Sequence, residues 1–335
     1  MKLFHAAATA LMLTTGAVSA QEFSFKFQSS DPAGNPNFEY QKGWTDLVAE
    51  RSGGRIAIEL LPVGSVVEYN ETLDAVAAGI IDGQICDSSY WAGKDPAFGL
   101  ISNPVGAWSA PEQMIDFVEN GGGKELMQEL LESYGLHFIG VSTPGLEAFV
   151  SRVPLAGVDD LKGLKVRTPE GPIANVFAAA GASPVNLPSS EVFTSIDKGV
   201  VDAADYSVFS VNQQQGLNQV APNPVYPGFH SLPLVEVSLN KAKWDALPDD
   251  LKTVMEETVK EFQQTQLAGN RAADEAALAE AEADPNITVH NWSEEDRVKF
   301  RTLGVAEWEK IATQSPMAQK VFDTLTTYLR DNNLL

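Results

Sequence analysis

Apolar and polar residues change their spacing repeatedly along the chain, and each change predicts a new element. The segment 23–27 alternates phenylalanine with polar residues, which is the period of a β-strand. The segment 38–51 instead gathers its apolar residues on one helical face, and a Ser-Gly-Gly turn ends it. The same patterns predict later strands at 55–61, 83–87, 136–141, 164–167, 200–204, 233–237 and 287–291, with helices between them. Strands that alternate with helices indicate an α/β protein.

Two stretches far apart in the sequence share one design. The segments 77–83 and 197–203 each combine a helix end, a glycine, two aliphatic residues and an aspartate. This repeat predicts two similar lobes, although the common chemistry of helix ends could produce so short a match by itself. A chain of 335 residues with 44% apolar residues is long enough for two lobes with sizeable cores.

The longest predicted helix covers residues 249–284. Apolar residues recur at helical spacing in its first half, an Ala/Glu-rich run follows, and Pro285 lies directly beyond its end. A coiled-coil dimer is the alternative interpretation. We favour a single helix because the apolar repeat is not sustained over enough heptads.

The first twenty residues have the three regions of a secretory signal. A basic Lys2 precedes an apolar stretch, and small residues Ser19 and Ala20 follow it. The apolar stretch is too short for a permanent membrane helix, and no later segment approaches the required length. We expect cleavage after Ala20, export to the periplasm, and no membrane insertion of the mature chain.

Charge and cysteine content limit the partners and the chemistry. The formal charge of −22 becomes −23 when Lys2 is removed, and the chain has no basic runs. Nucleic acids and anionic membranes are therefore excluded as partners, because phosphates require clustered Lys and Arg. The single cysteine, Cys86, lies in an apolar strand and is interpreted as a core residue rather than a nucleophile.

Three candidate binding residues follow predicted strands. Arg167 lies at the end of one strand, at the edge of the sheet where α/β proteins bind ligands, and its guanidinium could hold a carboxylate by two hydrogen bonds. An ordinary surface ion pair is the alternative for Arg167. Tyr90 and Trp91 follow another strand and could form the wall of a binding pocket or belong to a lobe core.

Several motifs resemble one family of transport proteins. The stretches KGLKVRTPEGP, GASPVNLPSSEVFTSIDKGVVDAADYS and VYPGFHSLPLVEVSLNKAKWDALP are similar to the DctP-type solute-binding proteins of tripartite ATP-independent periplasmic (TRAP) transporters. SSYWAGKDPAFGL and ENGGGKELMQEL resemble the subgroup that is associated with 2-oxo acids and lactate. The motifs occur in the family's order across nearly the whole mature chain.

The resemblance implies an α/β, two-lobed periplasmic-binding-protein fold with a central cleft and a long helix spanning both lobes. The expected division is a signal peptide at 1–20, lobe I at 21–143 with 234–270, and lobe II at 144–233 with 271–335. The implied function is capture of a small organic acid by lobe closure and its delivery to a TRAP membrane permease. No catalytic cofactor is expected.

The resemblance also supplies site residues. In the subgroup, a cation bridges the substrate carboxylate to oxygens at the positions of Glu147, Tyr206 and Glu236, and Phe229 is expected to reach the ligand. Glu147 departs from the family, in which this position is typically basic or an amide. Carboxylate and carbonyl oxygens suit calcium, with sodium as the lesser possibility. Glu236 could instead pair with an Arg or Lys across the cleft.

Two other functions remain as alternatives. Without a metal, the same acids favour a zwitterionic ligand whose amine pairs with Glu147, or a sulfonate could bind. A hydrolase using Glu147 and Glu236 as a carboxylate pair is a remote possibility. The chain has no nucleophile elbow, zinc motif or dinucleotide-binding glycine pattern, so we expect a binding protein rather than an enzyme.

Overall fold

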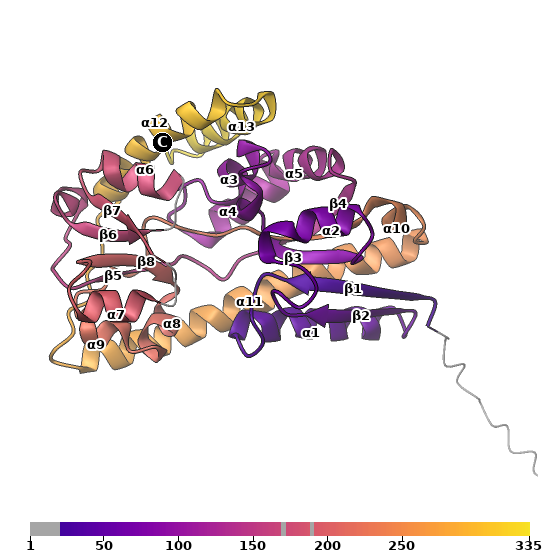
Figure 1. Cartoon of the computed structure of the whole chain (residues 1–335), viewed down its shortest axis with the longest axis horizontal. Coiled ribbons are helices and arrows are strands. Elements are labelled where there is room, and N and C mark those ends of the chain that lie inside the picture. The colour runs from indigo at the N-terminus through magenta and orange to yellow at the C-terminus, as the bar shows by residue number, and fades with distance from the viewer. Residues whose placement is uncertain (1–20, 169–171, 188–190) are drawn as a thin grey trace, which may run out of the picture.

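Two β-sheets with helices packed around them form the two lobes of the protein (Figure 1). The structure, a computed structural model, describes residues 21–168, 172–187 and 191–335. The predicted signal peptide at 1–20 lies outside the described residues. The two-lobed α/β fold that the sequence predicts is confirmed. Among the described helices, none has the length and apolar character that crossing a bilayer requires.

Lobe I is built on a five-stranded sheet of order β2-β1-β3-β9-β4. Strands β1, β2 and β3 are parallel, whereas β9 runs antiparallel to both of its neighbours. The strands are β1 (Phe23–Ser29), β2 (Ile56–Leu61), β3 (Gly83–Asp87), β4 (Leu136–Ser142) and β9 (Val235–Asn240). Helices before residue 143 are α1 (Pro36–Arg51), η1 (Tyr69–Glu71), α2 (Thr72–Ala77), η2 (Ser88–Trp91), α3 (Pro96–Ser102), α4 (Pro111–Asn120) and α5 (Gly123–Glu132).

Lobe II is built on a four-stranded sheet of order β5-β8-β6-β7. Its strands are β5 (Ala148–Ser151), β6 (Lys165–Thr168), β7 (Ser183–Asn186) and β8 (Ala203–Ser207), and β5 is antiparallel to β8. The helices around it are η3 (Val158–Leu161), α6 (Pro172–Ala179), α7 (Val192–Asp197), α8 (Phe209–Gln214) and α9 (Leu217–Val220). A short helix α10 (Lys241–Asp245) follows β9, and the chain ends with α11 (Asp249–Ala283), α12 (Glu294–Ala312) and α13 (Pro316–Asp331).

The repeat seen in the sequence is also a repeat of backbone hydrogen bonds. The amide of Asp82 donates to the carbonyl of Lys26 at 2.8 Å, and the amide of Asp202 donates to Lys165 at the same distance. The glycine that lies three residues before each aspartate has a similar positive φ angle, 72° at Gly79 and 69° at Gly199. The two lobes therefore share one helix–glycine–strand unit in which α2 corresponds to α7 and β3 to β8.

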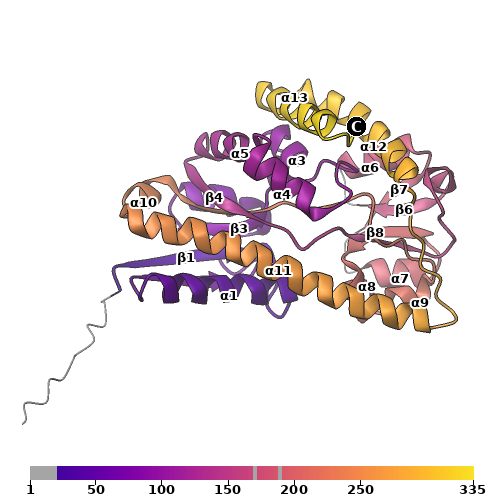
Figure 2. The ribbon, with the colours of Figure 1, turned by 180° about the vertical axis from the view of Figure 1, so that it is seen from behind.

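Helix α11 packs against both lobes and crosses the whole molecule, as Figure 2 shows from behind. It contacts α1 and β4 in lobe I and α8 in lobe II. Its buried face carries polar side chains where it passes between the lobes: Gln263 donates to the carbonyl of Val141, and Asn270 donates to that of Pro144. The predicted long helix is confirmed.

The last helix, α13, packs mainly on lobe I. Its apolar residues Val321, Leu325 and Leu329 belong to the same cluster as Leu126 and Leu130 of α5. The sequence-based division placed residues 271–335 in lobe II. The apolar contacts of α13 with α5 instead pack this helix against lobe I. Helix α12 contacts α6 on one side and α3 on the other, so it connects the lobes opposite α11.

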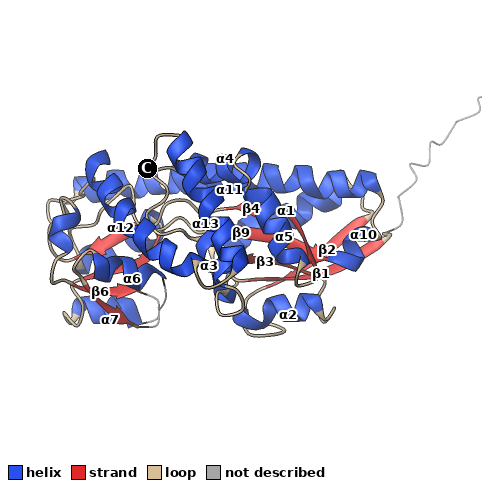
Figure 3. Ribbon diagram, turned by 90° about the horizontal axis from the view of Figure 1, so that it is seen from above, coloured by secondary structure: helices blue, strands red, loops and turns tan. Residues whose placement is uncertain are grey.

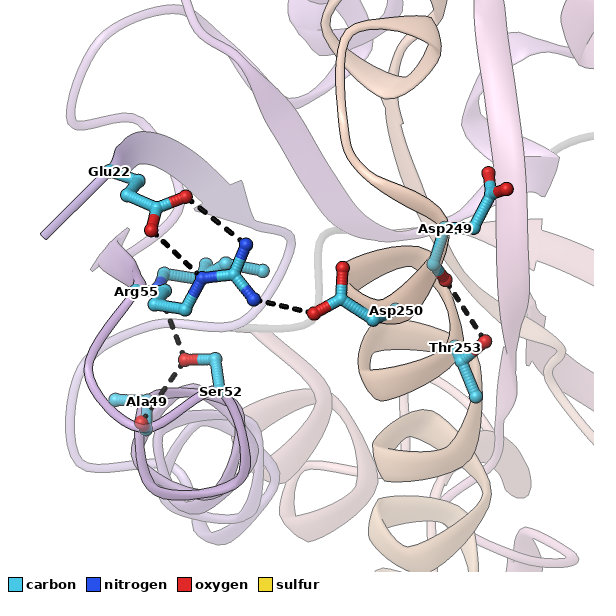
Figure 4. A network of polar contacts seen from close by, with 8 residues as sticks. Glu22, Ala49, Ser52, Arg55, Asp249, Asp250 and Thr253 are labelled. Carbon is cyan, nitrogen blue, oxygen red and sulfur yellow. Dashed lines mark hydrogen bonds and ion pairs between the residues drawn. The ribbon is translucent and has the colours of Figure 1, made fainter. Parts of the chain in front are cut away.

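A cluster of polar contacts fastens the start of the described chain (Figure 4). Arg55, directly before β2, pairs with Glu22 through two nitrogens, at 3.0 and 3.1 Å, and also with Asp250 at the start of α11. The hydroxyl of Ser52 accepts from the amide of Ile56 at 3.1 Å, which orders the turn between α1 and β2. These contacts join the N-terminal strand to the long helix.

Three predicted strands differ from the structure, and the strand predicted at 233–237 is β9, which covers Val235–Asn240. Residues 287–291 form no strand and make one isolated bridge, between His290 and Val225. The strand predicted at 200–204 begins three residues later, at Ala203, because Val200 belongs to the turn that follows Gly199 and is 49% exposed. The aliphatic residues of this turn are of the types that favour a strand, so the sequence pattern alone predicts a strand there.

Candidate functional site

Arg167 lies in lobe II near the end of β6, where the sequence places it. Arg167 is only 7% exposed, and its guanidinium donates to two backbone carbonyls, from Nε to Leu187 at 3.0 Å and from Nη1 to Asp205 at 2.6 Å. These two bonds fix the plane of the guanidinium. A solvated surface ion pair therefore does not describe this residue.

Next to Arg167, two carboxyl groups and an imidazole converge. Glu147, Asp205 and His230 each offer one ligand atom, and these atoms lie within 4.8 Å of one another. Nε2 of His230 is 2.7 Å from Oδ1 of Asp205, while a carboxylate oxygen of Asp205 lies 4.0 Å from Nη1 of Arg167. Three segments of lobe II thus meet at one point: the β4–β5 connection, the end of β8, and the connection that leads to β9.

The close approach of the two connections positions Glu147. Its amide donates to the carbonyl of Ser231 at 3.0 Å, so the two connections lie side by side. A Cβ atom at Gly228 would be 1.8 Å from the carbonyl oxygen of Glu147, and only glycine leaves room for this contact. The position of the Glu147 side chain thus depends on the packing of both connections between the lobes.

The environment of Glu147 disfavours its charge. Burial, followed by the negative charge of Asp205, raises the pKa of the Glu147 carboxyl group well above its usual value. A hydrogen bond from Ser231 acts in the opposite direction, and a hydrogen bond with Asp205 favours the protonated form. The raised pKa therefore favours the protonated form of the Glu147 carboxyl group.

Lobe I contributes two further carboxyl groups. Asp31 follows β1 and Asp87 ends β3, so both lie at the carboxyl edge of parallel strands. Burial raises the pKa of Asp31 to about 6, with a bond from Gln41 opposing this effect and the charge of Asp87 adding to it. Burial also raises the pKa of Asp87, although Ser102 donates a hydrogen bond to it at 2.7 Å.

Tyr90 lies on the lobe I side of the same region. Its ring is 41% exposed, and burial of the hydroxyl group, then the charges of Asp87 and Asp31, raise the pKa of this phenol well above its usual value. The charge of Glu147 contributes as well. Tyr90 is therefore close enough to the carboxyl groups of both lobes to respond to them.

Tyr206 and Glu236 do not join this cluster through their side chains. The hydroxyl of Tyr206 donates to Gln215 at 2.5 Å. Glu236 lies within β9 of lobe I, is fully buried, and accepts a hydrogen bond from Gln84 at 2.5 Å. Burial raises its pKa to about 8. The carboxyl neighbour of Glu147 is Asp205, so the Glu147–Glu236 pair required by the hydrolase alternative is not formed.

Two predicted ligand residues lie in the lobe cores. Trp91 is 1% exposed and contacts Phe98 edge to face at 5.6 Å between centroids. Phe229 is 2% exposed and stacks on Trp292 at 3.6 Å. Their packing does not support direct contact with a ligand. Cys86 is a fully buried core residue, as the sequence indicates.

The site residues predicted from the sequence do not include Asp205, His230, Asp31 or Asp87. Asp205 directly follows the apolar part of its strand, as Arg167 and Asp87 do. This position near the end of a strand is the feature of the sequence that could have identified Asp205 as a site residue. A lone histidine is more often an ordinary polar residue than a ligand group, and the role of His230 depends on Asp205, which is 25 residues earlier in the chain.

The donor set suits a cation. Ligand atoms within 4.8 Å of one another can share one ion at oxygen distances of about 2.4 Å, as calcium requires. The Glu147 carboxyl group would lose its proton when the ion binds. Glu147 and Asp205 provide hard oxygen ligands, whereas His230, hydrogen-bonded to Asp205, is better suited to orient that carboxylate.

A two-lobed α/β fold with a charged site between the lobes defines a class, the extracytoplasmic solute-binding proteins. The family model for DctP, "bacterial extracellular solute-binding protein, family 7", matches residues 27–315. The chain belongs to this family and is a TRAP-type solute-binding protein. The family and its solved structures are transport proteins and not enzymes.

Individual relatives give more detail. A TRAP periplasmic solute-binding protein from Rhodobacter sphaeroides, solved in an apo open form, is 68% identical with a TM-score of 0.87 and covers 93% of this chain and 99% of its own. A monocarboxylate 2-oxoacid-binding periplasmic protein from Nostoc is 29% identical over 69% of this chain, and the match spans 64% of that relative's length. A TRAP protein from Colwellia psychrerythraea, with bound calcium and pyruvate, is 23% identical with a TM-score of 0.80, covering 93% of this chain and 96% of its own.

Proposed function

We propose that this protein captures a small organic carboxylate, a 2-oxo or 2-hydroxy acid, together with a cation, and delivers it to a TRAP membrane permease. The observation that carries the proposal is the carboxyl pair of Glu147 and Asp205 beside the buried Arg167. The expected setting is the periplasm, after removal of residues 1–20.

Arg167 would hold the carboxylate of the ligand. Its guanidinium is already oriented by two carbonyl groups, so little entropy is lost when it binds an anion. An anion alone would be repelled by the ionised carboxyl groups of this acidic site. A bound cation reverses the sign of the local field, which is why an acidic site can accept an acid.

Calcium, or sodium as the lesser possibility, would be held by Glu147 and Asp205, with the backbone carbonyl of Tyr206 as a further oxygen. The cation supplies the positive charge that attracts the carboxylate and the 2-oxygen of the ligand. Glu236 remains a proposed ligand on the lobe I side. Pyruvate with calcium or with sodium in solved relatives of the same fold supports this assignment.

Thermal unfolding of the metal-stripped mature protein tests the proposal. Pyruvate, lactate, longer 2-oxo acids and amino acids would each be added with and without calcium. Ligands that bind the folded state raise the melting temperature by mass action. We expect 2-oxo or 2-hydroxy acids to stabilise the protein only when calcium is present.

A different result would favour the second candidate. Stabilisation by an amine-bearing compound, unchanged by calcium, would mean that the acidic site binds a zwitterion and holds no metal. The four acids around the site favour a positively charged group in the ligand, which makes this a specific alternative. Stabilisation by a sulfonate without calcium would likewise contradict the proposal that a cation takes part in ligand binding.

A further inference from the structure

The segment 103–106, which connects α3 to α4, takes part in the packing of both lobes. Val105 is buried in the lobe II cluster that contains Phe300 of α12, whereas Trp108, three residues later, belongs to the main cluster of lobe I. Helix α12 contacts α3 of lobe I and α6 of lobe II; seen from above, α12 and α6 lie in one half of the molecule and α3 near its middle (Figure 3). The segment therefore reaches from lobe I to the base of the charged site.

Two glycines bring this segment directly against the backbone of α12. A Cβ atom at Gly106 would be 2.9 Å from the ring of Phe300, and one at Gly304 would be 2.5 Å from the carbonyl oxygen of Val105. Only glycine leaves room for such contacts, and the φ angle of 80° at Gly106 also favours it. The position of the segment is thus set by α12.

Arg301 of α12 fastens the segment further. It is fully buried, and its Nε donates to the carbonyl of Gly106 at 2.9 Å, while Nη2 donates to the hydroxyl of Ser109 at 2.8 Å. Nη1 donates to the carbonyl of Leu334 near the end of the chain. In the part of the chain that the structure describes, Arg301 makes no ion pair. A buried guanidinium is costly unless its donors are bonded, so these bonds hold both Arg301 and Gly106 in place.

Gly106 in turn holds the main chain of His230. The amide of Gly106 donates to the carbonyl of His230 at 2.9 Å. The imidazole of His230 lies 2.7 Å from Asp205. Arg301 is therefore linked to the carboxyl group of Asp205 through two intervening residues.

Asn103 supports the other carboxyl group of the site. Its Nδ2 donates to the hydroxyl oxygen of Ser231 at 2.8 Å, and its Oδ1 accepts from the amide of Leu232 at 3.3 Å. Ser231 is also hydrogen-bonded to the carboxyl group of Glu147. A hydroxyl group has only one hydrogen, and because the oxygen of Ser231 accepts from Asn103, that hydrogen stays free for Glu147.

We propose that Asn103 and Arg301 are positioning residues for the cation site. Asn103 orients the carboxyl group of Glu147 through Ser231, and Arg301 fixes, through Gly106, the imidazole that orients Asp205. This inference rests on the proposed function and adds two residues that touch neither the ion nor the organic acid. One segment of lobe I thereby supports both carboxyl ligands, which belong to lobe II.

Calorimetric titration with calcium in the presence of pyruvate provides the first test. Partners that orient metal ligands typically contribute about 10- to 100-fold to metal affinity, so Asn103→Ala and Arg301→Lys should each weaken calcium binding about tenfold or more. Lysine keeps the charge but cannot reach Gly106, Ser109 and Leu334 together. Asn103 is only partly buried, so Asn103→Ala should fold even if Arg301→Lys does not.

Val321→Ala is the control for a general loss of stability. Val321 is fully buried in the lobe I cluster on α13, so its truncation lowers the melting temperature. Effects of distant sites are independent, and calcium affinity should change by less than about twofold in this variant. An equal loss of affinity in Val321→Ala would mean that Asn103 and Arg301 act only through stability, and the inference would be rejected.

Double variants test the two routes separately. Asn103→Ala should weaken calcium binding no further when Ser231→Ala is already present, and Arg301→Lys should weaken it no further in His230→Phe. A purely structural effect would persist in both backgrounds, because unconnected effects add in free energy. Full additivity in both pairs would overturn the inference and leave the proposed function intact.

A measurement without calcium separates this inference from the proposed function. The imidazole N–H signal of His230 in the proton NMR spectrum of the metal-free protein can be identified by its loss in His230→Phe. Arg301→Lys should shift this signal, whereas Val321→Ala should not. If the wild type binds no calcium, the proposed cation site is rejected. The signal then decides alone: a shift keeps Arg301 as the residue that fixes His230, and an unchanged signal rejects that role.

Discussion

Nε2 of His230 lies 2.7 Å from Oδ1 of Asp205, and this contact joins the aromatic core of lobe II to the charged site. The imidazole is 1% exposed and packs edge to face against Phe149 at 5.1 Å between centroids. The aromatic core thereby fixes the ring, and the ring fixes the carboxylate of Asp205. A residue far from any surface can in this way control a binding site.

Replacing His230 by phenylalanine should weaken calcium binding. The new ring keeps most of the packing with Phe149 and Phe177, but Asp205 loses its fixed partner. Loss of a partner that orients a metal ligand typically costs about 10- to 100-fold in affinity. Calorimetric titration with calcium in the presence of pyruvate measures this change. An unchanged affinity would mean that Asp205 needs no orientation by His230.

Arg167→Lys should bind organic acids at least about tenfold more weakly although the charge is kept. Lysine cannot make the planar pair of hydrogen bonds to a carboxylate, nor reach both carbonyls of Leu187 and Asp205. Titration with pyruvate in calcium tests this. Arg152→Lys in the same lobe is a control and should leave the affinity unchanged.

Glu236→Gln should stabilise the calcium-free protein at neutral pH. The pKa of Glu236 is raised from 4.5 to about 8, so the folded protein holds a proton that the unfolded chain releases. Stability is therefore lost as the pH rises from about 4.5 to about 8. Glutamine resembles the protonated acid and should add roughly 2–3 kcal/mol at pH 7, and almost nothing at pH 4.

Urea unfolding at pH 4, 7 and 9 measures this dependence. Equal stability of the two proteins at all three pH values would show that Glu236 carries no proton at pH 7. The same variant tests the proposed ligand role of Glu236. If the carboxylate binds calcium, Glu236→Gln should also abolish the stabilisation that calcium gives in the presence of pyruvate.

Gly228→Ala should both destabilise the protein and weaken ligand binding. The added methyl group would lie 1.8 Å from the carbonyl oxygen of Glu147, so the two connections must separate. We expect a loss on the order of 2–3 kcal/mol, as for other overpacked sites, and displacement of Glu147. Urea unfolding and titration with pyruvate measure the two effects.

Gly43→Ala is the control for this change. Gly43 lies within α1, and a Cβ atom there would meet no heavy atom within 4 Å. Alanine is favoured over glycine inside a helix by about 1 kcal/mol, so this variant should be equally or more stable. Equal stability of Gly228→Ala and the wild type would contradict the close approach at Glu147.

The sequence predicted the elements well where periodicity alone decides them. Helix α11 was expected at 249–284 and covers Asp249–Ala283, because its apolar spacing and the following Pro285 are local signals. The start of β8 was misjudged, since Val200 has the residue type of a strand but follows a glycine with positive φ. A turn of this kind is recognised only from its backbone.

The site was predicted in part. Arg167 was found because it ends a strand, which is a property of the local sequence. Glu147 was named through the family resemblance, but its partner Asp205 was not, because their contact joins segments 58 residues apart (205 minus 147). Whether a polar residue at a strand end faces a partner depends on the three-dimensional path of both connections between the lobes.

Strand β9 has a consequence for how the protein is made. It lies between β3 and β4 in the sheet of lobe I, yet it is synthesised after the strands of lobe II. Until residues 235–240 emerge from the ribosome, β3 and β4 have no shared neighbour and lobe I cannot complete its sheet. Long-range pairing of this kind slows folding. Lobe I should therefore complete its sheet only after most of the chain, including every strand of lobe II, has been synthesised.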